Sequence, residues 1–147
     1  ETDAEIRELF HLPKDLEIQD NVIFLGEVND QQKKEIFESA SLMVMPTSNQ
    51  IHNRSVEGFG IAYIEAAIFG ICSVATNIGG VSDAIIDGET GILINSENDL
   101  YDCLSKILSD KIRLNKLGNQ AKERALQRFS WNVVIEKYLD ILKINSY

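Results

Sequence analysis

Short apolar runs alternate with amphipathic stretches along most of the chain. Four runs are largely apolar without alternation, which is typical of strands covered on both faces of a parallel sheet. These predicted strands are Val22–Leu25, Leu42–Met45, Cys72–Ala75 and Gly91–Ile94. The predicted helices between them are Gln31–Ser41, Ile61–Phe69 and Val81–Ile86. Strands that alternate with helices predict an α/β fold, a Rossmann-like parallel sheet flanked by helices and joined by right-handed crossovers.

Both ends of the chain are predicted to be helical. A helix is expected over Asp3–Leu12 and should end before Pro13, because proline lacks a backbone N–H and crowds the preceding turn. Three amphipathic helices are predicted after the last strand, over Glu97–Ser109, Ile112–Phe129 and Ser130–Lys143. Trp131, Tyr138 and Leu142 share one face of the final helix, so we expect them to pack into the core.

Composition and charge narrow the class of protein. A chain of 147 residues with 44% apolar content can bury one core, so we expect one domain over residues 1–147. The net charge of −9 disfavours nucleic acid and anionic membrane surfaces as partners. No run approaches the roughly 18 to 20 apolar residues that span a bilayer, and no signal-peptide pattern is found. Cys72 and Cys103 lack CxxC spacing and are predicted to be small buried hydrophobes in a reducing compartment, which favours a cytoplasmic protein.

The candidate site lies in the loops that follow the strands, because ligands of open parallel sheets bind at the carboxyl ends of strands. The segment after Pro46 is too long for a simple turn and ends in Glu57-Gly58-Phe59-Gly60 directly before a helix. The two glycines permit close approach of the backbone to a ligand. The free N–H groups and dipole of the following helix then favour a diphosphate.

Two carboxylates flank this predicted diphosphate site. Glu57 lies at its rim, where a carboxylate suits sugar hydroxyls better than phosphate. Glu65 falls roughly 7 Å along the helix axis, a separation that suits a ribose. Each residue also has a simpler interpretation, since Glu57 can be a solvated loop acid, Glu65 an exposed helix residue, and the glycines turn residues.

Other polar positions near the predicted site stay open. Gly79-Gly80 also opens a helix after a strand, and is either a second anion site or a tight turn, the turn being the simpler account. His52 and Arg54 lie in the long loop without neighbours at metal-ligand spacing, so their role is left open.

The string as a whole resembles a family signature. Glu57 to Ala66 is similar to the Glu-seven-residues-Glu signature of glycosyltransferase family 4, also called the group 1 glycosyl transferases. Five further segments fall in that family's order and spacing: Val22–Gly26, Ala40–Pro46, Gly79-Gly80, Asp87–Gly91 and Phe129–Trp131. The resemblance covers nearly the whole chain. It implies the C-terminal, nucleotide-sugar-binding half of the two-domain GT-B fold.

The resemblance also implies roles for individual residues. Glu57 is the implied catalytic residue and bonds hydroxyls of the donor sugar. The implied donor-binding residues are Val28, Gly58, Phe59, Gly60, Ile61 and Glu65. Among them, Glu65 holds the ribose and the backbone around Val28 meets the base, while N–H groups of the glycine-rich loop meet the sugar and diphosphate. The implied reaction moves a sugar from a nucleotide-diphosphate donor to an acceptor hydroxyl, with retention and without a metal or other cofactor.

The sequence departs from the family pattern at three points. The family's pyrophosphate-binding Arg and Lys lie on an earlier strand and loop. We therefore expect an N-terminally incomplete domain that lacks its first strands, has an exposed sheet edge, lacks its acceptor domain and is inactive alone. Gly70-Ile71-Cys72 lacks the proline that the family often has there. Asp83 stands where the family usually has glutamate, so no catalytic role is assigned to it.

Partners and alternative functions follow from this resemblance. The expected partners are a nucleotide-sugar donor and a sugar or lipid-linked acceptor, the latter bound through the missing N-terminal domain. Any contact with the inner membrane face is expected through that domain too. Synthesis of polysaccharide, lipopolysaccharide or other glycoconjugates stays open. One alternative is a non-catalytic nucleotide-sugar-binding module, because fold does not fix function. Another is a sugar-nucleotide epimerase, which needs additional acids and histidines that the sequence does not show.

Overall fold

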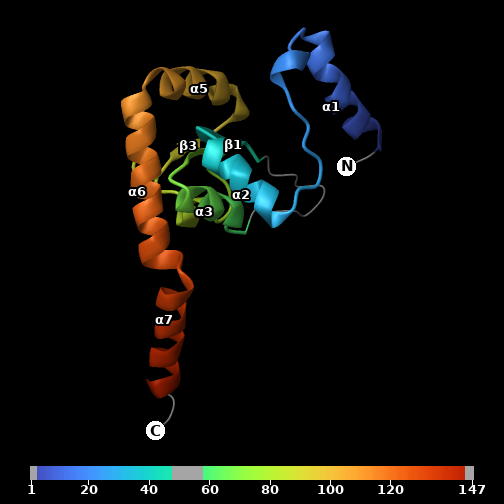
Figure 1. Cartoon of the computed structure of the whole chain (residues 1–147). Coiled ribbons are helices and arrows are strands. Elements are labelled where there is room, and N and C mark those ends of the chain that lie inside the picture. The colour runs from blue at the N-terminus through green and yellow to red at the C-terminus, as the bar shows by residue number, and fades with distance from the viewer. Residues whose placement is uncertain (1–2, 48–57, 145–147) are drawn as a thin grey trace. The chain divides into compact units, whose positions relative to one another are not determined.

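The computed structural model describes residues 3–47 and 58–144, and the chain divides into two compact units, Glu1–Glu35 and Ile36–Tyr147. The first unit contains α1 (Asp3–Asp15), the short 3-10 helix η1 (Gln19–Asn21) and the first part of α2 (Asp30–Ser39). It occupies the blue end of the ribbon (Figure 1). The second unit contains the end of α2 and every described strand.

Helix α1 continues through Pro13, so the expectation that it ends at Leu12 is wrong by about one turn. Proline lacks the N–H that would donate to the preceding turn, and its ring crowds that turn, but neither effect ends the helix here. Bonding resumes immediately, because Leu16 N–H donates to the Leu12 carbonyl at 3.0 Å and Ile18 N–H to the Pro13 carbonyl at 2.8 Å. Pro13 itself is buried, so the last turn of α1 is packed and not solvated at this position.

The segment Val22–Leu25 does not form the predicted strand. Ile23 is 81% exposed and the Phe24 ring instead packs on Phe10, with ring centroids 4.4 Å apart. Among its described residues the first unit contains only helices besides this segment, so the segment has no strand to pair with inside its own unit. A strand needs a hydrogen-bonded neighbour, and an apolar run alone does not supply one. The prediction of a strand here is wrong for that reason.

The other three predicted strands form one parallel sheet in the second unit. They are β1 (Leu42–Met45), β2 (Cys72–Thr76) and β3 (Ile92–Ile94), in the order β1-β2-β3. In this register Val44 is opposite Val74, which is opposite Ile92. All five residues of the central strand are buried, as predicted for a strand covered on both faces. The outer strand β1 has no second neighbour among the described residues.

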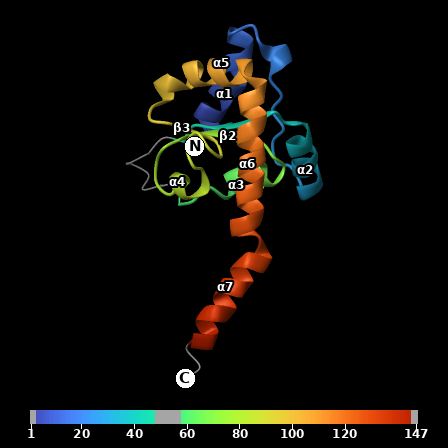
Figure 2. The ribbon, with the colours of Figure 1, turned by 90° about the vertical axis from the view of Figure 1, so that its left-hand side faces the viewer.

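Helices cover both faces of this sheet (Figure 2). The helices of this unit after α2 are, in chain order, α3 (Ile61–Ile68), α4 (Val81–Ala84), the 3-10 helix η3 (Glu97–Asp99), α5 (Leu100–Ser109), α6 (Lys111–Phe129) and α7 (Trp131–Ile144), of which α7 lies away from the sheet (Figure 1). On one face Ala75 packs with residues of α3 and α4. On the other, Cys72 packs with Ile107 of α5 and with Leu114 and Leu117 of α6. Successive strand residues face opposite sides, so the two clusters sandwich β2.

Helix α6 crosses close to the sheet because small residues line its inner side. A Cβ added at Gly118 would overlap the carbonyl oxygen of Gly70, so α6 packs there backbone against backbone. Ala121 and Ala125 continue this inner side and pack on Ala67 of α3. The backbone of Gly118 is therefore fixed by contact, and the helix continues through it unbroken.

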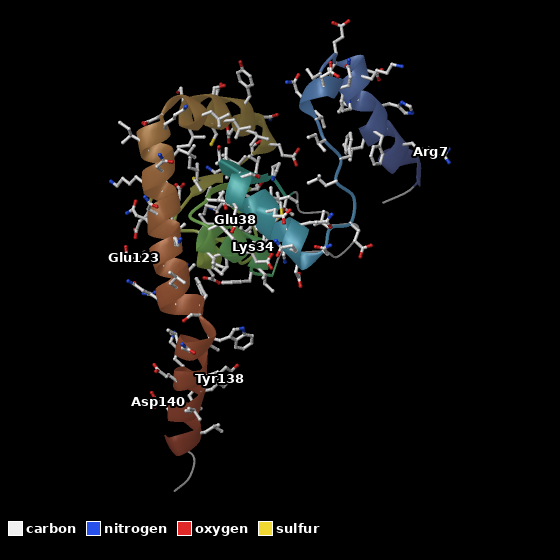
Figure 3. All side chains as sticks on the ribbon, viewed as in Figure 1. Arg7, Lys34, Glu38, Glu123, Tyr138 and Asp140 are labelled. Carbon is white, nitrogen blue, oxygen red and sulfur yellow. The ribbon has the colours of Figure 1, made fainter. Side chains whose placement is uncertain are left out.

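The final helix does not return to the core. Trp131 is 79% exposed and Tyr138 and Leu142 are also exposed, so the expectation that they pack into the core is wrong. Figure 1 shows α7 continuing beyond the end of α6, and Figure 3 shows Tyr138 projecting from it. Helical periodicity identifies an apolar face but not the surface that covers it. No helix among the residues described has the length and apolarity needed to cross a membrane.

Candidate functional site

The loops after β1 and β2 meet at the carboxyl edge of the sheet, where the sequence places the candidate site. Tyr63, in the first turn of α3, is 2% exposed and its hydroxyl donates to the carbonyl of Met45 at 3.1 Å. Met45 is the last residue of β1. This bond ties the amino end of α3 to the carboxyl end of β1, although 18 residues separate the two partners.

Gly60 determines how the chain enters α3. It is the N-cap of the helix with φ 82°, a left-handed conformation that favours glycine, and its carbonyl accepts from Tyr63 N–H at 3.0 Å. A Cβ at Gly60 would overlap the Tyr63 ring. Because glycine has no side chain with which to cap the helix, the N–H groups of Ile61 and Ala62, which precede the bonded N–H of Tyr63, can donate to an external anion. The close approach of a ligand to the backbone at Gly60 stays a prediction.

The glycines of the loops after β1 and β2 differ in whether the structure requires glycine at their positions. A Cβ at Gly80 would overlap the carbonyl oxygen of Gly58, so the loop after β2 contacts the donor loop, which is the segment Gly58–Gly60. Gly79 has a positive φ of 52°. The N–H of Val81 donates to the Ile78 carbonyl at 3.2 Å, which favours the tight-turn interpretation of Gly79-Gly80 over a second anion site. A Cβ at Gly58 would meet no atom of the described residues within 4 Å.

Of the other residues predicted for the site, some lie among the described residues and some do not. Glu65 is the fifth residue of α3, as predicted, and is half-buried. Ile61 begins the helix and its side chain is 71% exposed. Val28 is half-buried just before α2 in the first unit. Glu57, the predicted catalytic residue, lies outside the described residues, as do His52 and Arg54.

One cluster beside the donor loop was missed by sequence reasoning. The ring of Phe59 meets Phe129 edge-on, with centroids 5.4 Å apart and planes at 69°. The Arg124 guanidinium lies 5.0 Å from the centroid of the same Phe129 ring. Burial is the main reason that the pKa of Arg124 is lowered, and the nearby charge of Arg128 acts in the same direction. An arginine on an amphipathic helix resembles a solvated surface cation, so the sequence carries little signal for this contact.

The cysteines lie away from the candidate site. Cys72 is buried on β2, and burial raises the pKa of its thiol to about 11, with a smaller contribution from Cys103. Cys103 is only half-buried, so its prediction as a buried hydrophobe is only partly right. Among the residues that the structure describes, no group of three or more His, Cys, Asp or Glu side chains is arranged to hold a metal ion.

Comparison with known proteins identifies the family to which these features correspond. The family model described as glycosyl transferases group 1 matches residues 4–124. Among curated relatives, the alpha-1,3/1,6-mannosyltransferase ALG2 of Dictyostelium discoideum is 30% identical over 139 residues. The match covers 94% of this chain and 31% of that relative, so the chain spans about a third of its length.

Solved structures give the same fold. Sucrose-phosphate synthase from Thermosynechococcus elongatus is 26% identical with a TM-score of 0.79, over 95% of this chain and 34% of that one. The Anabaena protein HepE, solved in complex with UDP, is 21% identical with a TM-score of 0.81, over 94% of this chain and 36% of its own. The expected fold class, a Rossmann-like parallel sheet flanked by helices as in the C-terminal half of GT-B glycosyltransferases, is thereby confirmed.

Proposed function

The chain belongs to the glycosyl transferases group 1, and from this premise we propose that it binds a nucleotide-diphosphate sugar and serves its transfer, with retention, to an acceptor hydroxyl. The observation that carries the proposal is the amino end of α3. There Gly60, in a left-handed conformation, leaves the first N–H groups of α3 without a side-chain cap at the carboxyl edge of the sheet. A helix N-terminus in that position is suited to a diphosphate.

The proposed roles of the remaining residues follow the family resemblance. Phe59, Gly60 and Ile61 offer backbone N–H groups to the sugar and diphosphate, and Gly58 keeps the loop close to them. Glu65, in the second turn of α3, holds the ribose hydroxyls. Glu57 bonds the sugar as the catalytic residue, and the backbone at Val28 meets the base. Charge that develops on the departing phosphate is stabilised by these positioned dipoles.

The relatives' names support a sugar donor without fixing which one. One curated relative is named as a mannosyltransferase, and one structural neighbour was solved with UDP. For this chain we propose a nucleoside diphosphate sugar as donor and a sugar or lipid-linked hydroxyl as acceptor, in polysaccharide, lipopolysaccharide or other glycoconjugate synthesis. The proposed reaction uses no metal and no other cofactor, as the family resemblance implies.

Calorimetric titration of the protein expressed from its complete gene tests the donor site. Uridine, guanosine and adenosine diphosphates and their sugar conjugates are titrated into wild type, Glu65→Ala and Glu136→Ala. Glu136 is an exposed carboxylate on α7 and serves as the matched control. We expect saturable binding of one nucleotide that weakens by about 1 to 3 kcal/mol in Glu65→Ala alone, the scale of a lost charge-assisted hydrogen bond.

Product analysis then separates the possible functions. A glycosylated acceptor with free nucleotide, an unchanged anomeric configuration and unchanged turnover after chelation supports the proposed transferase. Binding without turnover points to a non-catalytic module, and an epimerised nucleotide sugar to an epimerase. Folded wild type that binds none of the nucleotides would overturn the proposed donor site.

A further inference from the structure

Arg124 holds the end of a short helix that borders the donor loop. Its Nη1 donates to the carbonyl of Ala84 at 3.0 Å and its Nη2 to the carbonyl of Asp83 at 2.8 Å. These are the last two carbonyls of α4, which have no intrahelical donor. A guanidinium fork satisfies both at once, and its positive charge is favourable at the C-terminus of a helix.

The other end of α4 touches the donor loop directly. Gly80 is the N-cap of α4, and its Cα leaves no space for a side chain against the Gly58 carbonyl. Helix α4 has four residues, so it spans only about 6 Å at 1.5 Å per residue. A displacement of its carboxyl end is therefore transmitted to Gly80, and from there to the peptide of Gly58.

A second connection runs through two aromatic rings. The guanidinium of Arg124 lies over Phe129, and Phe129 meets the ring of Phe59 edge-on. Both geometries are attractive, because a ring face is electronegative and a ring edge electropositive. The Phe59 ring also packs against the buried cluster that contains Tyr63 and Ala75. Its backbone belongs to the donor loop, so Arg124 reaches Gly58 and Phe59 by two independent routes.

Neighbouring Arg128 shows what an ordinary surface arginine looks like on the same helix. It lies one turn further along α6 and is exposed, whereas Arg124 is half-buried. Lysine at position 124 would keep the charge but could not present two parallel donors to adjacent carbonyls. The contacts of Arg124 thus depend on its guanidinium geometry, not only on its charge.

We propose that Arg124 is a positioning residue for the donor site. It holds the Gly58–Gly60 loop in its binding geometry by two routes, one through α4 and one through Phe129. Its effect on nucleotide affinity rests on the proposed function. Its effect on the conformation of the loop does not depend on that function, so nucleotide affinity and loop conformation are measured separately.

The loop is tested first by amide NMR spectra of the whole chain without ligand. Arg124→Met keeps the apolar stem and removes the fork, Arg124→Lys keeps the charge, and Arg128→Met is the matched control. We expect the amide signals of Gly58, Phe59, Gly60 and Gly80 to shift or broaden in Arg124→Met, to shift less in Arg124→Lys, and to stay unchanged in Arg128→Met. Unchanged loop signals in folded Arg124→Met overturn the positioning role, whether or not the protein binds a nucleotide.

Affinity is tested with UDP and GDP as probes. We expect the Kd of Arg124→Met to rise on the order of tenfold, because small misplacements of binding groups already weaken interactions strongly. Ile107→Val, in the core cluster on the opposite face of the sheet, controls for a general loss of stability and should bind as wild type. Equal affinities in these two variants would reduce Arg124 to a structural residue and overturn the proposal.

Two outcomes need separate interpretation. If wild type binds neither probe, the proposed function fails for these donors, while the loop spectra still decide the role of Arg124. If Arg124→Met does not fold, Arg124→Lys and Phe129→Leu replace it. Arg124→Lys loses the fork and should perturb all four amide signals, whereas Phe129→Leu loses the ring contact and should perturb the signals of Gly58, Phe59 and Gly60. Signals that stay unchanged in both folded variants overturn the proposal.

Discussion

Replacing Gly60 by alanine tests the conformation on which the donor site depends. At φ 82° the alanine adopts a left-handed conformation, which costs about 1 to 2 kcal/mol for an L-residue. Its Cβ would also overlap the Tyr63 ring. Tyr63 is 2% exposed and bonded to Met45, so the ring cannot simply swing away. Forcing a methyl group into such packing adds about 1 to 3 kcal/mol.

The expected loss in the free energy of unfolding is therefore about 2 to 5 kcal/mol. Urea denaturation followed by circular dichroism measures it, provided that the m-value stays constant. Gly58→Ala is the matched control, two residues earlier in the same loop. Among the described residues no atom lies within 4 Å of a Cβ at Gly58, so we expect a change within about 1 kcal/mol, which can be stabilising.

A double-mutant cycle divides the loss at Gly60 into its two causes. Tyr63→Leu removes the ring edge that the new methyl group would meet, so the part of the loss caused by crowding should disappear in Gly60→Ala/Tyr63→Leu. The part caused by the positive φ should remain. A Gly60→Ala variant as stable as Gly58→Ala, or a cycle without coupling, would refute the reasoning from backbone conformation and ring overlap.

Two further predictions concern single side chains. Tyr63→Phe keeps the ring but removes the 3.1 Å bond to the Met45 carbonyl; we expect a loss of about 0.5 to 1.5 kcal/mol in urea denaturation, and an unchanged midpoint would show that water replaces the hydroxyl. In native protein at pH 8 a maleimide should label Cys103 before Cys72, because burial raises the pKa of Cys72 to about 11 and leaves little of the reactive thiolate. Equal rates are expected only in urea, and equal rates in native protein would contradict the burial of Cys72.

The elements that sequence predicted well are those whose partners follow directly along the chain. Strands β1, β2 and β3 lie side by side in sequence order, with helices between them, so the apolar pattern was enough to place them. The strand expected at Val22–Leu25 failed because strand formation requires a neighbour that no local pattern supplies. Helix α7 formed as predicted, but Trp131 stayed exposed because periodicity does not identify the surface that covers a face.

The same distinction applies inside the candidate site. The start of α3 directly after Gly60 and the position of Glu65 on that helix follow from a string of nine residues, so the sequence predicted them. The bond from Tyr63 to Met45, the contact of Gly80 with Gly58 and the edge-on contact of Phe59 with Phe129 join residues that lie far apart in the sequence. Their partners were not visible in any window of the sequence.

These long-range contacts bear on what a signature can establish. The glycine-rich string specifies a local backbone shape, but the loop is held in place by α4 and by a ring at the end of α6. A chain with an intact signature that had lost the equivalent of Arg124 or Phe129 would still match the family and would still form α3. Its loop would be less constrained, and a donor would pay the entropy of ordering it on binding. Loss of affinity through such remote substitutions is therefore a physical route from a transferase to a weak binding module, and Arg124→Met reproduces its first step.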